Sequence, residues 1–367
     1  MNTLVNGTKN NILTLVIPNR NRELKIVERS LNSLYKQLDE RLEVSVVDYG
    51  STVAYQQQLQ KLLLTFPKIK CKQLPVQGQL WNKSRAINIV LKTCKTEYFM
   101  LSDMDMIYHP GFINEIFNLL SPKEGQYFPV GVLTADESKI KKAFSEYKVK
   151  FWTNAEATGI TVFPTAILKG IHGYDEFFHG WGSEDTDVHN RLKNAGYKVI
   201  FHPDEKILLH QWHPKIYRSA KSIAPVHLHL ERINMQYMQL RKQLKATTAN
   251  PHLPWGVVPN EEDDTKLGFP DINLQLHHTK DQVAGLCFAL QQQKNDAVVC
   301  FEITTHPEKK QIKTPLKKLL KKKIPLFIDA ERSNEIILEE IISNHRHRPY
   351  RYNFDRETGI ITGTIFF

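Results

Sequence analysis

Residues 12–48 read ILTLVIPNRNRELKIVERSLNSLYKQLDERLEVSVVD. The segment opens with a short apolar run (12–17) closed by Pro18 and ends with a second such run (42–47), and both patterns are typical of strands. Residues 23–37 between them show helical periodicity, with four apolar side chains on one face: Leu24, Val27, Leu31 and Leu34. A strand, a helix and a strand in this order favour a parallel sheet.

The same alternation continues beyond this unit. We predict a helix at 53–66, a strand at 69–74, a helix at 82–94 and a strand at 98–101 that leads directly into Ser102. The expected fold class is therefore α/β, with a mostly parallel sheet flanked by helices. In open sheets of this kind ligands bind beyond the carboxyl ends of the strands, so a site is expected there before any motif is considered.

Two carboxylates, Asp103 and Asp105, follow the last of these strands and are separated by Met104. Carboxylates this close repel one another unless a positive group lies between them. Mg²⁺ and Mn²⁺ prefer oxygen ligands and often complete their coordination with diphosphate oxygens. The motif therefore predicts a divalent cation, Mn²⁺ or Mg²⁺, beside a nucleotide diphosphate, although acidic pairs also occur in solvated loops.

A second motif, GWGSEDTD, occupies residues 180–187 and precedes a helical pattern that ends at Gly196. Unpaired amides and the macrodipole favour its three carboxylates at a helix N-terminus, so an ordinary acidic helix start would also explain them. Trp181 between two glycines adds a flat apolar surface beside these acids. The tryptophan could stack on a sugar ring while a neighbouring carboxylate takes the proton of a sugar hydroxyl. We therefore interpret the motif as catalytic.

In combination these motifs resemble a known family. Together with Asp48, IPNRNR at 17–22 and WNKSR at 81–85, they occur in the order and approximate spacing of GT-A-fold glycosyltransferases. The likeness is to the β-1,4-galactosyltransferase type and to the transferase domains of chondroitin-type polysaccharide synthases, which are similar to glycosyltransferase family 2. It covers roughly residues 12–215, about the first 60% of the chain.

The resemblance implies a UDP-sugar as donor. The residues that it assigns to the donor are Pro18, Arg20, Arg22, Asp48, Lys83, Arg85 and Asp103. Asp48 is expected to contact the uracil, and Lys83 or Arg85 the phosphates. UDP-galactose or UDP-N-acetylgalactosamine ranks first among the donors, followed by UDP-glucuronic acid and UDP-N-acetylglucosamine.

The same resemblance gives the metal ligands. Asp103 and Asp105 would face the ion, with Asp105 the more direct ligand. A histidine is expected just beyond the strand that follows the acidic helix, which favours His210 and keeps His213 in reserve. Neutral imidazole suits Mn²⁺, the expected cofactor, with Mg²⁺ as the alternative.

Catalysis and acceptor binding are assigned to the second motif. Asp185 would be the general base, with Glu184 the alternative and Asp187 a weaker third. The acceptor, a glycan or glycoconjugate hydroxyl, would contact Trp181, Gly182 and Asp187. The sequence departs from the galactosyltransferase pattern at Ser183, where glycine is usual, and at Thr186, so the acceptor is not identified. Inversion at the anomeric carbon is expected, and a retaining route stays open.

The C-terminal part of the chain shows no catalytic motif. We predict a transferase domain at 1–246, a linker at 247–271 and a small α/β accessory domain at 272–367. Within the last, helices are expected near 280–293 and 334–344, and strands at 297–303 and 325–328, before a hairpin at 350–366.

The chain carries a formal net charge of +10, and eight lysines fall between Lys309 and Lys323. This segment is expected to be a solvated helix face or to contact a polyanion or the inner surface of a membrane. It lacks interleaved aromatics, so no nucleic acid is expected. The four cysteines form no CxxC pair and no long apolar run occurs, which together predict free thiols and a cytoplasmic location.

Two other classes of protein compete with this interpretation. A non-catalytic carbohydrate- or nucleic-acid-binding protein could use the basic segment, but would not require both acidic motifs. A nucleotidyltransferase would also join metal carboxylates to a parallel sheet. It would normally show a glycine-rich phosphate loop after the first strand, where this chain has Pro18 to Arg22.

Overall fold

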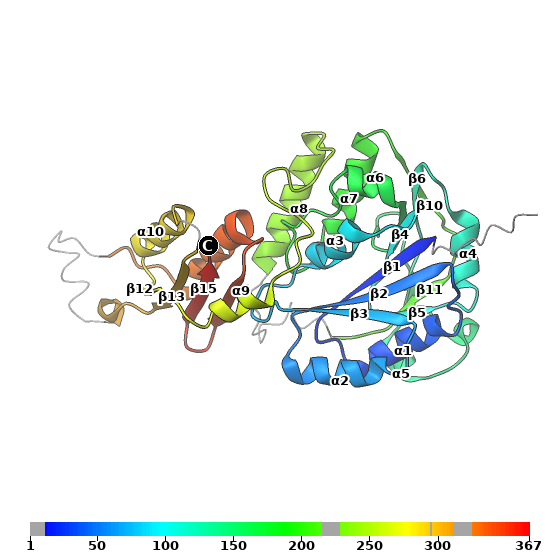
Figure 1. The fold of residues 1–367 in the computed structure, drawn as a ribbon, viewed down its shortest axis with the longest axis horizontal. Coiled ribbons are helices and arrows are strands. Elements are labelled where there is room, and N and C mark those ends of the chain that lie inside the picture. Colours follow the sequence, from blue (N-terminus) through cyan, green and yellow to red (C-terminus); the bar gives the residue numbers. More distant parts are fainter. Residues whose placement is uncertain (1–11, 215–227, 294–295, 311–324) are drawn as a thin grey trace, which may run out of the picture.

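The computed structural model describes residues 12–214, 228–293, 296–310 and 325–367. In this part of the chain the backbone forms three sheets, two in a larger N-terminal body and one in a smaller C-terminal body (Figure 1). Most of the lysine-rich segment from Lys309 to Lys323 lies outside the described residues, and its expected helix is therefore untested.

The main sheet has seven strands in the order β10-β6-β9-β4-β1-β2-β3. Their bounds are β1 (Leu13–Asn19), β2 (Leu42–Tyr49), β3 (Ile69–Leu74), β4 (Tyr98–Leu101), β6 (Glu124–Tyr127), β9 (Thr161–Pro164) and β10 (Lys198–Phe201). Neighbouring strands are parallel except where β9 pairs with β4 and β6. The predicted α/β class with a mostly parallel sheet is confirmed.

Helices cover both faces of this sheet (Figure 1). On one face lie α1 (Leu24–Tyr35), α2 (Val53–Leu63) and α4 (Phe112–Leu119), and on the other α3 (Lys83–Thr93), α6 (Thr165–Gly170) and α7 (Glu184–Asn194). The strand β1 is buried along its whole length, with Leu15 and Ile17 in one core and Val16 in the other. Burial on both faces explains why this strand is a nearly continuous apolar run.

A second sheet is small but matters for the site. Its strands, in the order β5-β11-β7-β8, are β5 (Met106–Tyr108), β11 (Leu208–His210), β7 (Gly131–Val132) and β8 (Phe151–Trp152). The antiparallel pair β5 and β11 places His210 opposite Met106, the residue that follows Asp105. The backbone N–H of Gln211 also donates to the carbonyl of Asp105 at 2.9 Å.

The third sheet belongs to the C-terminal body and has the order β12-β13-β15-β14. Its strands are β12 (Ile272–His277), β13 (Val298–Thr304), β14 (Tyr350–Asp355) and β15 (Ile360–Phe366). The helix α10 (Lys280–Gln291) and the helix α12 (Ala330–Glu340), continued by a π-helical turn η4 (Ile341–His345), pack on it. The strand expected at 325–328 is wrong, because this segment forms a single bridge from Phe327 to Thr279.

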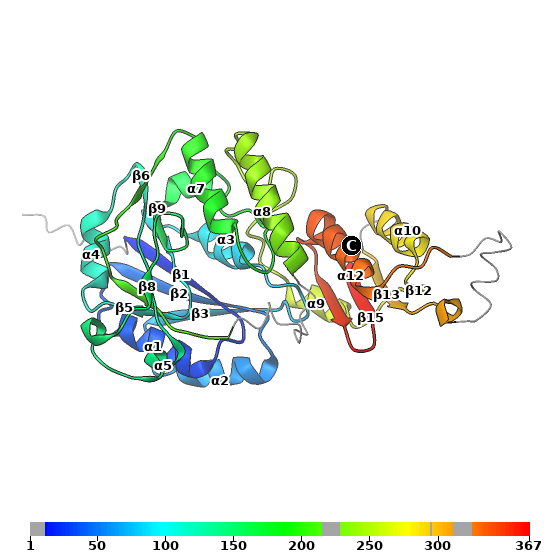
Figure 2. The same cartoon turned by 180° about the vertical axis from the view of Figure 1, so that it is seen from behind.

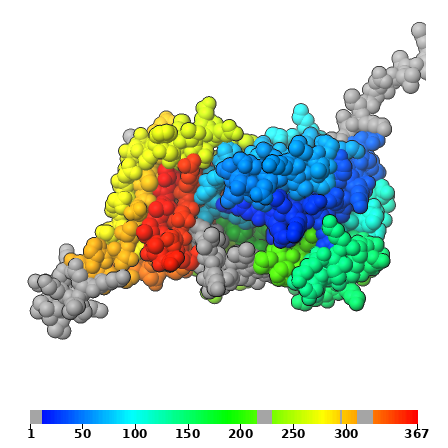
Figure 3. Space-filling model, turned by 90° about the horizontal axis from the view of Figure 1, so that it is seen from below, coloured from blue at the N-terminus to red at the C-terminus, as the bar shows by residue number. Residues whose placement is uncertain are grey.

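Two helices lie between the bodies, α8 (Leu228–Gln243) and α9 (Glu261–Lys266) (Figure 2). The segment expected to be a linker thus contains a short helix. The core of the C-terminal body also takes in Leu80 and Leu230 from outside the third sheet. In Figure 3 the red C-terminal residues abut the blue and cyan N-terminal body. The proposed domain boundaries stay predictions.

The remaining elements are short: α5 (Ala135–Lys139), η1 (Phe144–Glu146) and η3 (Pro307–Lys310). Among the described residues, no helix combines the length and the apolar character that crossing a bilayer requires. All four cysteines are free, as expected, and Cys71 is exposed.

Candidate active site

Asp48 is the last residue but one of β2 and lies beside Asn19, its neighbour at the end of β1. The side chain is fully buried and accepts hydrogen bonds from Asn19 Nδ2 at 2.9 Å, Ser51 Oγ at 2.5 Å and Gln56 Nε2 at 2.9 Å. Asp48 therefore lies at the expected edge of the sheet, inside a preformed polar network. Its contact with uracil stays a prediction.

The two acids of the strand-end motif face different partners. Met104 between them is buried in the core under β1 and anchors the turn. The carboxylate of Asp103 is 38% exposed and pairs with Lys83 Nζ at 3.2 Å. The carboxylate of Asp105 is almost fully buried and pairs with Arg22 at 3.2 Å.

Asp105, His210 and His213 form a group whose ligand atoms all lie within 4.8 Å of one another. The Nε2 atoms of the two histidines lie 3.4 and 3.2 Å from the Asp105 carboxylate. Burial favours a raised pKa for Asp105, but the two histidines and Arg22 outweigh it and hold this pKa below its usual range. This carboxyl group is therefore an anion at neutral pH.

These residues fit a divalent cation. Asp105 Oδ1 and His210 Nδ1 are buried and lack a hydrogen-bond partner within the described ranges. A carboxylate and two imidazoles are a ligand set that suits Mn²⁺. Both histidines proposed from the sequence belong to this group, whereas Asp103 is held by Lys83 outside it.

Lys83 forms ion pairs with acids of both motifs. It is the first residue of α3, and its Nζ lies 3.2 Å from Asp103, from Glu184 and from Asp185. Burial acts to lower the pKa of Lys83, but the three carboxylates outweigh it and raise this pKa well above its usual value. A permanently charged lysine thus connects the strand-end motif to the start of α7.

The loop before α7 has an unusual backbone. Gly180, Gly182 and Ser183 have φ angles of +75°, +94° and +76°. Serine rarely adopts this left-handed region, which glycine enters freely. The geometry explains why glycine is the usual residue at the position of Ser183. Trp181 within this loop is 51% exposed, and a Cβ at Gly182 would meet no described atom within 4 Å.

Asp185 has the properties of a proton acceptor. Its Oδ2 contacts Lys83, while its Oδ1 is buried and has no hydrogen-bond partner in the part of the chain that the structure describes. Burial raises the pKa of Asp185 well above its usual value, with Glu184 and Asp103 adding to the shift and Lys83 opposing it. A carboxylate with a free oxygen and a raised pKa is suited to general-base catalysis.

The residues assigned to the donor do not all lie together: some are near the acidic motifs, and Arg85 lies between the two bodies. Pro18 is buried in β1, Arg22 reaches Asp105, and Arg20 donates to the carbonyl of Gln79 at 2.9 Å. Arg85 is 2% exposed and donates to the carbonyls of Arg346 and His347. Of the two side chains expected at the phosphates, Lys83 therefore lies among the acids, and Arg85 is a buried contact between the bodies.

The assignment of Asp187 to the acceptor does not fit its position. Its side chain is 1% exposed and pairs with Arg191 at 2.6 Å and Arg241 at 3.4 Å. Both oxygens are thus used inside the protein. Arg191, four residues later on the same helix, was a signal for such a pair.

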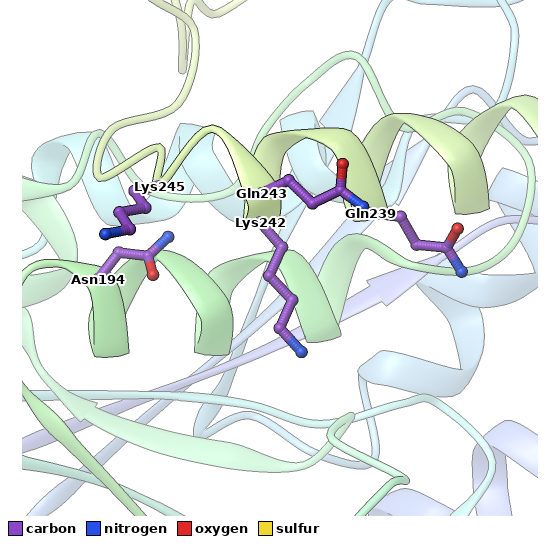
Figure 4. Close-up of a pocket in the computed structure, with 5 residues that line it drawn as sticks. All are labelled: Asn194, Gln239, Lys242, Gln243 and Lys245. Atoms are coloured by element: carbon purple, nitrogen blue, oxygen red, sulfur yellow. The ribbon is translucent and has the colours of Figure 1, made fainter.

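A shallow surface hollow lies at the far end of α7 (Figure 4). Asn194 lines it from α7, and α8 and the residues just after it supply the rest: Gln239, Lys242, Gln243 and Lys245. The eleven residues of α7 place its ends roughly 15 Å apart. The hollow is therefore separate from Glu184 and Asp185.

Strand-end acids and a tryptophan-glycine loop before α7 are the features through which the sequence resembles glycosyltransferases. Residues 14–154 match the family model described as glycosyl transferase family 2, and residues 138–213 match that of the N-terminal domain of galactosyltransferase. The two matches, which together span residues 14–213, support a family-2-like glycosyltransferase and so confirm the resemblance drawn from the motifs. This range contains all the acids and histidines described above.

The chain is also similar to individual proteins. It is 24% identical to chondroitin sulfate synthase 3 of Homo sapiens over 162 residues, 41% of this chain and 18% of that protein. Identity to chondroitin sulfate synthase 3 of Mus musculus is 22% over 169 residues, 42% of this chain and 18% of the relative. The matches thus span less than a fifth of either relative.

Among solved structures, the chain is similar to the mannosyltransferase PcManGT from Pyrobaculum calidifontis in complex with GDP-Man and Mn²⁺. The TM-score is 0.42 and the identity 19%, with 65% of each chain covered. This likeness is too distant to bear on the chemistry.

Proposed function

We propose that this chain transfers a sugar from a UDP-sugar to a hydroxyl of a glycan or glycoconjugate. One observation carries the proposal: two carboxylates, the buried Asp105 and the partly buried Asp185, belong to one domain but have opposite surroundings. Asp105 lies among an arginine and two histidines, and Asp185 among acids that share one lysine. The first arrangement suits a metal and the second a proton acceptor.

The donor side is built from cationic and metal-ligating groups. When bound, a divalent cation held by Asp105, His210 and His213 would supply positive charge for the diphosphate oxygens. Arg22, 3.2 Å from Asp105, and Lys83, 3.2 Å from Asp103, add fixed positive charge beside the strand-end acids. Arg22 and Lys83 would stabilise charge on the departing UDP, which receives the electron pair of the broken bond.

The acceptor side is the loop before α7. Trp181 provides an apolar surface for a sugar ring, and Asp185 Oδ1, which is buried and forms no hydrogen bond within the described residues, would accept the proton of the attacking hydroxyl once the acceptor is bound. The hydroxyl oxygen forms a bond to the anomeric carbon as the bond to UDP breaks, and the proton passes to Asp185. A single displacement of this kind inverts the anomeric configuration.

The sugar and the biological setting are further parts of the proposal. UDP-galactose or UDP-N-acetylgalactosamine is the first choice, and polysaccharide biosynthesis the setting, on the likeness to the chondroitin synthases. Mn²⁺ is the expected ion. A cytoplasmic location, with contact of the Lys309–Lys323 segment to a membrane or polyanion, also belongs to the proposal.

A donor screen tests this function. UDP is titrated into the full chain in Mn²⁺ and in EDTA, and the four UDP-sugars named above are then assayed for Mn²⁺-dependent hydrolysis. We expect tighter UDP binding in Mn²⁺ and hydrolysis of a galactose-type donor. Equal UDP binding in EDTA and Mn²⁺, with no donor hydrolysed, would refute the proposal.

A further inference from the structure

The loop of residues 77–82 connects β3 to α3 and so leads directly to Lys83. Although it belongs to the N-terminal body, the C-terminal body holds it. The strand β14 and the segment before it lie against this loop, and their side chains and backbone make specific hydrogen bonds to it.

Three contacts fix the loop to β14. The hydroxyl of Tyr350 accepts a hydrogen bond from the Leu80 N–H at 3.0 Å. The N–H of Tyr352 donates to the carbonyl of Gly78 at 2.9 Å. The side chain of Leu80 is 3% exposed and lies in the apolar core of the C-terminal body.

A second set of contacts involves the arginines. Arg85 donates to Gln79 Oε1 at 3.2 Å and to the carbonyls of Arg346 at 3.2 Å and His347 at 3.4 Å. Arg20 donates to the carbonyl of Gln79 at 2.9 Å. Gln79 is therefore contacted by two arginines. Arg20 binds its backbone carbonyl, and Arg85, which also bonds to carbonyls of the C-terminal body, binds its side chain.

The far end of the loop reaches the catalytic residues. Asn82 caps α3 by accepting from the Arg85 N–H at 2.8 Å, which fixes the start of the helix at Lys83. The carbonyl of Trp81 accepts from the Gly180 N–H at 3.1 Å, beside Trp181. Displacement of the loop would therefore move both Lys83 and the acceptor loop.

We propose that the C-terminal body completes the donor side of the active site, and that Tyr350 is a positioning residue for the 77–82 loop and, through it, for Lys83 and Arg20. This inference rests on the proposed function. It assigns a catalytic purpose to a body without a catalytic motif. Loss of the Tyr350 hydroxyl would leave the buried Leu80 N–H without this acceptor and loosen the loop.

The test compares two conservative variants of the full chain. Tyr350→Phe removes the bond to Leu80, whereas Tyr352→Phe removes the 2.8 Å bond to Asn334 within the C-terminal body and keeps the backbone bond to Gly78. Both tyrosines are buried in the same strand. We expect Tyr350→Phe to raise the donor KM by about 10-fold with a smaller change in kcat, and Tyr352→Phe to leave both near wild type.

Amide hydrogen exchange gives a readout independent of activity. The Leu80 amide should exchange about 10-fold faster in Tyr350→Phe and at the wild-type rate in Tyr352→Phe. Wild-type KM together with unchanged exchange over residues 77–83 in Tyr350→Phe would overturn the inference. An inactive wild-type chain would refute the proposed function, and exchange would then decide the positioning by itself.

Gly78→Ala provides a second variant if Tyr350→Phe does not fold. Gly78 has a φ of +82°, and a Cβ there would lie 3.2 Å from the Cβ of Arg351 on β14. The substitution should separate the loop from the strand and raise the donor KM in the same way. A folded Gly78→Ala protein with wild-type KM would contradict the inference.

Discussion

Asp105 and Asp185 are both carboxylates largely withdrawn from solvent, yet Asp105 lies among basic side chains and Asp185 among mostly acidic ones. Asp105 has Arg22, His210 and His213 within 3.4 Å. Asp185 shares the charge of Lys83 with two other acids. Burial favours a raised pKa at both residues, but Arg22 and the two histidines reverse the shift at Asp105, whereas Lys83 does not reverse it at Asp185.

The difference shows how one domain prepares two carboxyl groups for separate tasks. A carboxylate held ionised by its neighbours is a durable ligand, whereas one whose pKa is raised can accept a proton during a reaction. The strand-end position of Asp105 and the helix-start position of Asp185 create these surroundings.

The largest effect is expected at the metal ligand. Asp105→Asn should remove the Mn²⁺ enhancement of UDP binding and lower transfer by about 10³-fold, since a cation supplies several kcal/mol of charge stabilisation. Titration calorimetry and a transfer assay measure both quantities. Asp103→Asn is the matched control, because Asp103 contacts Lys83 outside the ligand group, and it should keep the Mn²⁺ dependence. Equal loss in both variants would disprove separate roles for the two acids.

Asp187 should affect stability rather than the acceptor. Asp187→Asn leaves the buried Arg191 and the partly buried Arg241 with weakened partners, so the free energy of unfolding should fall by about 3–5 kcal/mol. Urea denaturation measures this change. Asp136→Asn, at an exposed pair with Lys139, should leave stability unchanged. A stable Asp187→Asn protein with a raised acceptor KM would restore the acceptor assignment.

Burial also changes the pKa of a histidine in α7, and this makes stability depend on pH. Burial, aided by Lys193, lowers the pKa of His189 from 6.5 to about 3. The unfolded chain therefore binds a proton below pH 6.5 that the folded chain does not, and stability present above pH 6.5 is lost as the pH falls towards 3. Between pH 7 and pH 5 this loss is about 2 kcal/mol. Urea denaturation at both pH values should show a smaller loss in His189→Asn; an identical loss would contradict the account.

The smallest effect is expected at Ser183. Ser183→Gly relieves the left-handed backbone at φ +76° and should raise the free energy of unfolding by up to about 1 kcal/mol. Thr186→Gly, in the first turn of α7, should instead lower it by about 0.5–1 kcal/mol. Thermal denaturation compares the two. A destabilised Ser183→Gly protein would show that the serine side chain has a structural role.

Much of the fold and the site could be predicted because the signals are local. The apolar runs that become β1, β2 and β4 and the periodic segments that become α1 and α3 were visible in the sequence, and they place Asp48, Asp103 and Asp105 at strand ends. The strands β7 and β8 have two residues each and carry no periodic signal.

Other features depend on distant partners. Arg85 bonds to residues 261 and 262 positions later, so its burial could not be read from the local pattern. The same holds for Tyr350 and Leu80, which are 270 positions apart. Both histidines reach Asp105 because β11 ends at His210 and the chain returns His213 to the same carboxylate, which spacing along the sequence did not establish.

The most direct test of the account is the Asp185→Asn variant in single-turnover transfer to a working acceptor, with UDP-sugar affinity measured in parallel. The amide keeps the shape of the side chain but cannot accept the proton. We predict nearly unchanged donor affinity and a transfer rate lowered by about 10²–10⁴-fold, with Glu184→Gln less affected. Transfer by Asp185→Asn at the wild-type rate, whether or not Glu184→Gln is inactive, would contradict the assignment of Asp185 as the general base.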